Sequence, residues 1–268
     1  MAEAFLRWAG GKRWFIQKES HRLPNAEQYK RYIEPFLGGG SVFFYLEPKH
    51  ALLSDYNEEL IRAYIALRDN FDGIYHLLEK HQINNSKDYY YRIRNTHPTD
   101  PVDAAARTIY LNKACFNGIY RVNKSGEFNV PYGKRDVINF VYQKLKDASI
   151  ALKGIDIVAQ PYGTSIDEAE EGDFLFCDPP YALETAESFV GYNADSFTWE
   201  DQVQLADSLQ KAADRGVKVM VTNVDAPEVR ALYDEATFLI DNTSRNCRIA
   251  GGLEGRKVYP ELIATANI

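Results

Sequence analysis

The segment that most constrains this chain is Asp178-Pro179-Pro180-Tyr181, which follows the apolar run Asp173–Cys177. The run has the length and composition of a buried strand, so the segment is predicted to form the loop at that strand's carboxyl end. Two consecutive prolines fix φ and keep the loop extended. The aspartate and a proline carbonyl then form an acceptor pair suited to an amino group, and the tyrosine offers a flat face to a planar base. A strand-terminating turn is the structural alternative.

A glycine-rich turn is the second constraint. We predict the end of a strand at Tyr32–Phe36, a turn at Leu37–Gly40, a helix at Ser41–Leu46 and a second strand at Ala51–Asp55. This order opens a parallel α/β sheet, in which ligands lie at the carboxyl ends of strands. The turn lacks the Lys-Ser/Thr ending of a phosphate-binding loop. Asp55 is placed to accept hydrogen bonds from ribose hydroxyls or to cap a helix.

Strand and helix alternate again in the C-terminal half. The fold class we predict is therefore α/β with a Rossmann-like sheet. Strands are predicted at Ile155–Val158, Asp173–Cys177, Val217–Val221, Thr237–Asp241 and Val258–Thr265, and an amphipathic helix at Asp201–Arg215.

An insertion from about Tyr56 to Asp147 separates the two halves. Helical periodicity at Asn57–Lys80 and Asp103–Ala114 makes it mostly helical, and turn residues between Arg121–Asn123 and Glu127–Val130 predict a β-hairpin. Residues 105–146 hold eight basic and two acidic side chains, a net charge of +6 in a chain of net charge −7. A basic face on an acidic body suits a DNA-binding cleft, and a solvated surface is the alternative.

Composition narrows the remaining classes. The 268 residues are 45% hydrophobic, enough for a substantial core. The three scattered cysteines form neither a disulfide framework nor a zinc-binding pattern, and we expect no metal. The N-terminus shows no signal peptide and no apolar run approaches the roughly 20 residues of a membrane helix, so no membrane association and a cytoplasmic location are expected.

Taken in order, these motifs resemble the Dam-type DNA adenine-N6 methyltransferases (D12 class, alpha group). The resemblance is weakest at Phe71–Pro101 and has further support at Asn193–Thr198 and in the basic loop Arg248–Lys257. It implies a methyltransferase domain at 1–55 and 148–268 and a target-recognition domain at 56–147. It also implies S-adenosyl-L-methionine as cofactor, and double-stranded DNA, with GATC a candidate target, as substrate. The base would be flipped and methylated in line. The matching motifs are Phe5–Lys12, Tyr32–Phe44, Ser54–Asn57, Asn112–Gly133 and Asp178–Tyr181.

The resemblance also implies residue roles. Asp178, the Pro179 carbonyl and Tyr181 would be catalytic. Arg7 stands where the family has a lysine near the DNA, which keeps the charge but changes the hydrogen-bond geometry. The cofactor would contact Trp8, Lys12, Gly38, Gly40, Asp55 and Asp178. The DNA would contact Arg7, Phe116, Asn117, Ile119, Arg121 and Lys134, with Arg121 reading guanine.

Two other functions remain open. One keeps the chemistry but changes the substrate to RNA or a protein side-chain amide, although A-form RNA hides its major groove from a reader such as Arg121. The other is a DNA-binding module without catalysis, against which the intact Asp178–Tyr181 motif argues. Three settings fit the sequence: a stand-alone enzyme, protection of DNA from a companion restriction endonuclease, and service of a phage or mobile element.

Overall fold

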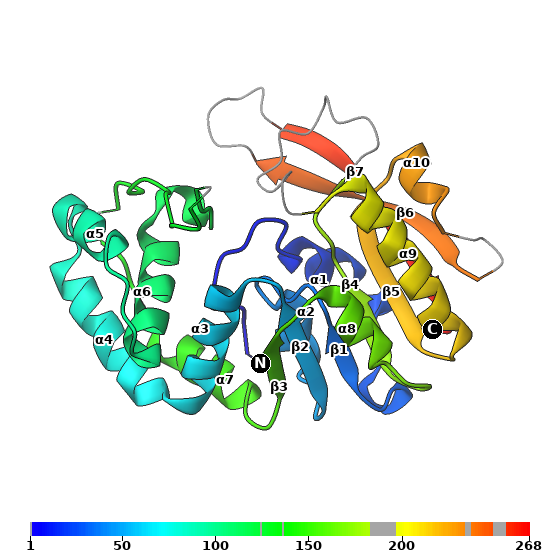
Figure 1. The fold of residues 1–268 in the computed structure, drawn as a ribbon, viewed down its shortest axis with the longest axis horizontal. Coiled ribbons are helices and arrows are strands. Elements are labelled where there is room, and N and C mark those ends of the chain that lie inside the picture. The colour runs from blue at the N-terminus through cyan, green and yellow to red at the C-terminus, as the bar shows by residue number, and fades with distance from the viewer. Residues whose placement is uncertain (1, 124, 136, 183–196, 234–236, 249–255) are drawn as a thin grey trace. The chain divides into compact units, whose positions relative to one another are not determined.

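The structure, a computed structural model, describes residues 2–123, 125–135, 137–182, 197–233, 237–248 and 256–268 (Figure 1). Packing divides the chain into two compact units. The first comprises residues 1–20, 37–49 and 54–159, and the second comprises residues 21–36, 50–53 and 160–268. The domain boundaries expected from the sequence separate a catalytic part from a target-recognition part. They are not the boundaries of these packing units, and they stay a prediction.

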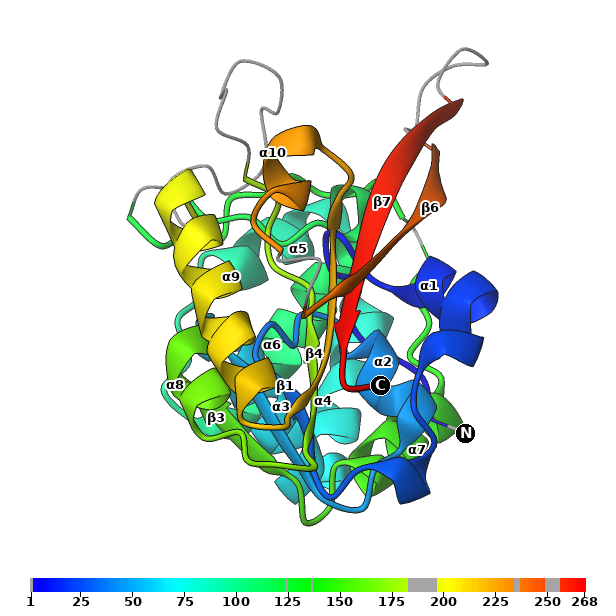
Figure 2. The ribbon, with the colours of Figure 1, turned by 90° about the vertical axis from the view of Figure 1, so that its right-hand side faces the viewer.

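A seven-stranded sheet in the order β3-β2-β1-β4-β5-β7-β6 confirms the α/β fold class. Strands β2, β1, β4 and β5 pair in parallel, whereas β7 is antiparallel to both β5 and β6. Figure 2 shows β6 and β7 as two long strands side by side. The strands are β1 (Tyr32–Glu34), β2 (Ala51–Asp55), β3 (Asp156–Ala159), β4 (Phe174–Cys177), β5 (Lys218–Val224), β6 (Leu239–Arg248) and β7 (Arg256–Ala266).

The second unit is built around β4, whose four side chains are all buried. A strand covered on both faces reads as a continuous apolar run, which is why the sequence located it correctly. Helix α9 (Trp199–Asp214) packs beside β5 and begins with a capping box formed by Thr198 and Asp201. The unit also contains α8 (Tyr162–Asp167), α10 (Pro227–Arg230) and the short 3₁₀ helix η2 (Ala26–Gln28). The 3₁₀ helix η1 (Ser20–Arg22) has its first residue in the first unit and its other two residues in the second.

The first unit is mostly helical, as expected for the insertion. The periodic stretch at Asn57–Lys80 forms two helices because Asn70 ends the first and caps the second by accepting the Gly73 N–H at 3.1 Å. Helix α6 packs against both of them. The helices are α1 (Arg13–Glu19), α2 (Ser41–Leu46), α3 (Glu58–Asp69), α4 (Phe71–Asn84), α5 (Lys87–Arg94), α6 (Pro101–Ala114), η3 (Phe116–Gly118) and α7 (Tyr142–Ala151).

The β-hairpin in the insertion is shorter than the sequence suggested. It forms a single antiparallel bridge between Val122 and Phe128, flanked by backbone hydrogen bonds. The Asn123 side chain accepts the N–H groups of Ser125 and Glu127 at 3.0 and 2.9 Å. These side-chain bonds close the turn of the hairpin.

Helix α4 carries a histidine that is neutral in the folded chain. The Nδ1 atom of His81 lies 2.7 Å from the Tyr89 hydroxyl, and its ring stacks on Tyr110 at a centroid distance of 4.7 Å. Burial lowers the pKa of His81 to about 4 from its ordinary 6.5. Between these values the unfolded chain binds a proton that the folded chain does not bind.

The free energy of unfolding is therefore expected to fall as the pH drops from 6.5 toward 4, by about 2 kcal/mol from this group. Thermal unfolding from pH 7 to pH 4 measures this change. A His81→Gln variant should lose that part of the pH dependence, and His97→Gln, at an exposed histidine, should retain it. Equal pH dependence in both variants would contradict the assignment.

Candidate active site and DNA-binding loop

The glycine turn after β1 is tied to the end of β2. The N–H of Gly38 donates to Asp55 Oδ2 at 3.0 Å, and Oδ1 of the same carboxylate accepts the Asn57 N–H at 3.0 Å. Burial raises the pKa of Asp55, and these backbone hydrogen bonds oppose that shift. The cap of α3 is Asn57, which accepts the Leu60 N–H at 3.0 Å. Asp55 therefore links the glycine turn to the residues after β2. Asn57, and not Asp55, caps α3.

Close packing explains two of the glycines. Gly38 has φ +46°, and a Cβ placed there would lie 2.7 Å from Trp8 Cδ1. Gly40 has φ +63° and lies against the Tyr64 hydroxyl, which would be 3.0 Å from a Cβ. Only glycine combines this left-handed backbone with so little space. The structure thus brings Trp8, Gly38, Gly40 and Asp55 into one group.

Lys12, which was also expected to contact the cofactor, is buried at 4% exposure. Its contacts include a hydrogen bond from Nζ to the Gly10 carbonyl oxygen at 3.3 Å and a position 5.9 Å from the centroid of Trp14. Both partners lie two residues from Lys12 in the sequence.

A hydrogen-bonded cluster around Glu59 was not anticipated from the sequence. Glu59 Oε1 accepts from Arg107 Nη1 at 3.0 Å and from Thr108 Oγ1 at 2.6 Å, and Oε2 accepts from the Tyr120 hydroxyl at 2.6 Å. Burial raises the pKa of Tyr120, and the Glu59 charge adds to the shift. The Tyr120 ring stacks on Trp8 at 4.9 Å with 24° between the planes. Glu59 thus links helices α3 and α6 to the loop that precedes the hairpin.

The first unit also joins Arg7 to that loop. The Asn112 side chain accepts the Arg7 N–H at 2.9 Å and donates to its carbonyl oxygen at 2.7 Å. The Arg7 side chain lies against Gly118, whose Cβ position is 2.5 Å from Arg7 Cδ. Burial lowers the pKa of Arg7, and Arg135 adds to the shift.

The tip of this loop turns through the left-handed backbone region and exposes an aromatic side chain. Asn117 and Gly118 both adopt positive φ, at +56° and +68°. Phe116 is 50% exposed, a large fraction for a phenylalanine, and Ile119 is partly exposed. Such backbone conformations in a non-glycine residue concentrate at functional sites.

The expected basic surface is smaller than the count of charges suggested. Arg107, one of the eight basic residues, is buried and paired with Glu59, and Lys144 pairs with Glu3 at 3.0 Å. Arg121 is exposed, and its Nε donates to Asn129 Oδ1 at 2.7 Å. Lys134 is also exposed.

The second unit holds the Asp178–Tyr181 loop at the end of β4. Thr222 Oγ1 donates to Asp178 Oδ1 at 3.1 Å, and the Tyr181 hydroxyl donates to Glu261 Oε2. Pro179 is buried and Pro180 is exposed. Cys177, the last residue of β4, is fully buried.

Two aromatic features escaped the sequence analysis. In the second unit, the Phe36 ring stacks on Tyr162 at 5.3 Å and meets Phe197 edge-on at 5.9 Å. In the first unit, Tyr56 directly follows Asp55 and is 81% exposed. An aromatic residue beside a glycine turn or a strand-end acid is the sequence signal that would have identified both.

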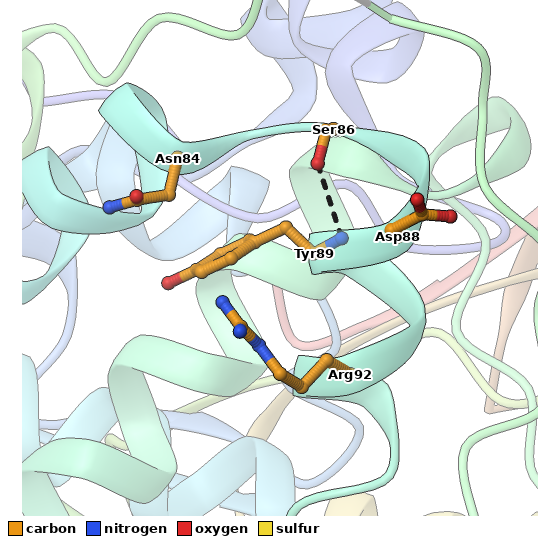
Figure 3. Close-up of a pocket in the computed structure, with 5 residues that line it drawn as sticks. All are labelled: Asn84, Ser86, Asp88, Tyr89 and Arg92. Carbon is orange, nitrogen blue, oxygen red and sulfur yellow. Dashed lines mark hydrogen bonds between the residues drawn. The ribbon is translucent and has the colours of Figure 1, made fainter.

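Figure 3 shows a surface pocket of about 400 Å³ that contains none of the expected site residues. It lies in the weakly matched stretch, where Ser86 Oγ accepts the Tyr89 N–H at 3.2 Å and the Arg92 guanidinium lies 5.0 Å from the Tyr89 ring centroid. Its lining residues are Asn84, Ser86, Asp88, Tyr89 and Arg92.

Several sequence expectations concern residues that the structure does not describe. Most of Asn193–Thr198 and of the basic loop Arg248–Lys257 lies outside the described residues. Within the described part of the chain, no three His, Cys, Asp or Glu side chains gather as a metal site. No helix in that part is both long enough and apolar enough to span a bilayer.

Comparison with known proteins identifies the family. Residues 8–247 match the D12 class N6 adenine-specific DNA methyltransferases. The chain is 36% identical over 246 residues to the Type II methyltransferase M1.LlaDCHI of Lactococcus lactis subsp. cremoris, covering 86% of this chain and 84% of that one. It is 34% identical over 267 residues to a DNA adenine methylase of Vibrio cholerae (97% and 95% covered) and 31% identical over 266 residues to that of Escherichia coli strain K12 (97% and 94% covered).

The chain belongs to the D12 class N6 adenine-specific DNA methyltransferase family. It is an enzyme, and its activity is adenine-specific methylation of DNA. The resemblance seen in the sequence is thereby confirmed.

The contact between Gly38 and Trp8 yields a test. A Gly38→Ala substitution adds a methyl group where Trp8 Cδ1 lies, so it should cost roughly 1–3 kcal/mol more than backbone strain alone. Gly126→Ala is the matched control, because Gly126 has φ +77° and no atom within 4 Å of its Cβ position. Chemical unfolding and tryptophan fluorescence measure the two effects. Equal losses with unchanged emission would show that Trp8 does not cover Gly38.

Proposed function

We propose that this enzyme transfers a methyl group from S-adenosyl-L-methionine to N6 of adenine in double-stranded DNA, with GATC as the target, after flipping the base out of the helix. The observation that carries the proposal is the Asp178–Tyr181 loop at the end of the buried central strand β4. Carboxyl ends of parallel strands are where α/β folds bind ligands.

The first unit carries side chains that fit the proposed cofactor. The carboxylate of Asp55 is held at the end of β2 by backbone N–H groups. It would accept hydrogen bonds from the ribose hydroxyls. The glycines at 38 and 40 allow the backbone to approach a ligand closely. Trp8 offers an aromatic face and Lys12 a cation for a carboxylate. When bound, S-adenosyl-L-methionine supplies an electrophilic methyl group.

Asp178 would be the catalytic acceptor: its carboxylate would accept a hydrogen bond from the adenine amino group. The lone pair of that nitrogen is delocalised into the ring, so the amine is a weak nucleophile. Acceptors at Asp178 and at the Pro179 carbonyl would draw the nitrogen toward tetrahedral geometry and stabilise its developing positive charge. Tyr181 would stack on the extruded base.

The loop of the first unit would read the DNA. Phe116 and Ile119 would fill the gap that the flipped base leaves, at a cost of a few kcal/mol for unstacking. The hydrogen bond from Arg121 to Asn129 uses Nε, whereas a bidentate contact to guanine O6 and N7 would use the terminal nitrogens. Arg7, beside Gly118, and Lys134 would contact the DNA nearby.

We expect Asp178→Ala to lower the transfer of tritiated methyl from S-adenosyl-L-methionine to duplex DNA by at least about 10²-fold, because an electrostatic acceptor is lost. Circular dichroism should show an unchanged fold. Asp207→Ala, at an aspartate 62% exposed on α9, is the control and should retain full activity. Duplex DNA should be the substrate, and faster methylation of RNA or protein, or near-normal activity of Asp178→Ala, would refute the proposal.

Arg121→Ala should relax specificity. Loss of one bidentate contact removes roughly 1–3 kcal/mol of discrimination, or about 5- to 150-fold. The ratio of kcat/KM for a GATC duplex to that for a duplex with the guanine pair replaced measures it. Lys134→Ala, the control, should weaken both duplexes alike and lower the salt dependence of binding. An unchanged ratio in Arg121→Ala would exclude this residue as the guanine reader.

A further inference from the structure

Glu261 is a buried carboxylate in the core, and packing alone does not explain it. Glu261 lies in the interior strand β7 and is fully buried. Burying a carboxylate is costly unless hydrogen bonds compensate, so an apolar residue would serve the core better. Its partners include the hydroxyl of Tyr181, the residue assigned to stack on the base. The carboxylate therefore fixes the far end of that ring.

Packing alone does not explain the buried hydroxyl of Thr222 in β5 either. Thr222 is fully buried, and valine would fill its volume without a polar group. Its Oγ1 lies 3.1 Å from Asp178 Oδ1 and 3.5 Å from the Cys177 carbonyl oxygen. A hydroxyl has one proton to donate, and the shorter distance directs it to Asp178. One carboxylate oxygen of Asp178 is thereby held.

The strand register brings these two residues together. In the antiparallel pairing of β5 with β7, Thr222 lies opposite Ile263 and Val224 lies opposite Glu261. Residues directly opposite project from the same face, as do residues two apart on one strand. Thr222 and Glu261 are thus diagonal neighbours on one face of the sheet, and both reach the loop that follows β4.

We propose that Thr222 and Glu261 are positioning residues for methyl transfer: Thr222 orients the Asp178 carboxylate and Glu261 anchors the hydroxyl end of the Tyr181 ring. This inference rests on the proposed roles of Asp178 and Tyr181. A ring fixed at its hydroxyl is preorganised to stack on an incoming base, and a carboxylate fixed at one oxygen presents the other to the amine. Misplacing either group by about 1 Å can cost up to about 10²-fold in rate.

The test for Glu261 is a double-mutant cycle with Glu261→Gln and Tyr181→Phe, each of which keeps the size of its side chain. Each single variant should lower kcat about tenfold with little change in the KM for S-adenosyl-L-methionine. The double variant should fall no further than Tyr181→Phe, because Glu261 acts through that hydroxyl. Multiplicative losses would overturn the proposal for Glu261.

A fluorescent base analogue reports how well the flipped base is stacked. With 2-aminopurine in place of the target adenine, we expect Glu261→Gln to extrude the base but to stack it less, so that emission rises above that of the unchanged enzyme. Identical emission would count against a role in fixing the ring.

The test for Thr222 uses Thr222→Val and Thr222→Ser. The valine variant should lower kcat about tenfold, and serine, which restores the hydroxyl, should recover most of the activity. Rescue by serine separates hydrogen bonding from packing, which serine reproduces poorly. Valine variants with full activity, or serine variants as slow as valine, would overturn the assignment.

Two reference variants distinguish the failure of this inference from that of the proposed function. If Asp178→Ala and Tyr181→Ala remain active, the proposed roles themselves are wrong. If these two are inactive while Glu261→Gln and Thr222→Val are folded and fully active, the roles stand and only the positioning inference fails. Thermal unfolding of every variant establishes which ones are folded.

Discussion

The Glu59 carboxylate is the contact on which the architecture of the first unit depends. It compensates the buried charge of Arg107 and also accepts from Thr108 and Tyr120. Removing one member of a buried ion pair typically costs 3–5 kcal/mol, because the other charge is left without compensation. Since Tyr120 also stacks on Trp8, the loop proposed to meet the DNA and the loop proposed to meet the cofactor share this support.

In the second unit the corresponding constraint is the sheet. The parallel strands β1 and β5 pair with the two edges of β4, whose four side chains are all buried, and Asp178 follows at the strand's carboxyl end. Strand β7 runs antiparallel to its neighbour β5, unlike β4, which pairs with β5 in parallel. Through it, a residue 80 positions away in sequence contacts Tyr181. The reactive loop is thus supported by distant parts of the chain.

The sequence predicted features whose cause is local. The glycine turn, β2 and β4 were located correctly because apolar runs and turn residues determine them within a few positions. Helix α7 was missed because its N-cap, Val141, makes no capping hydrogen bond, so no start signal precedes it. Arg107 was misread as surface charge because its partner Glu59 lies 48 residues away. Pairings at such separations depend on tertiary packing, which no local pattern encodes.

The burial of Cys177 has a chemical consequence. Its thiol is fully buried beside Asp178, and burial raises its pKa well above the ordinary value, with Glu34 and Asp178 adding to the shift. The thiolate, and not the thiol, is the reactive nucleophile of cysteine. A sulfur that is buried and kept protonated is a poor nucleophile, so Cys177 is chemically inert although it adjoins the acidic loop.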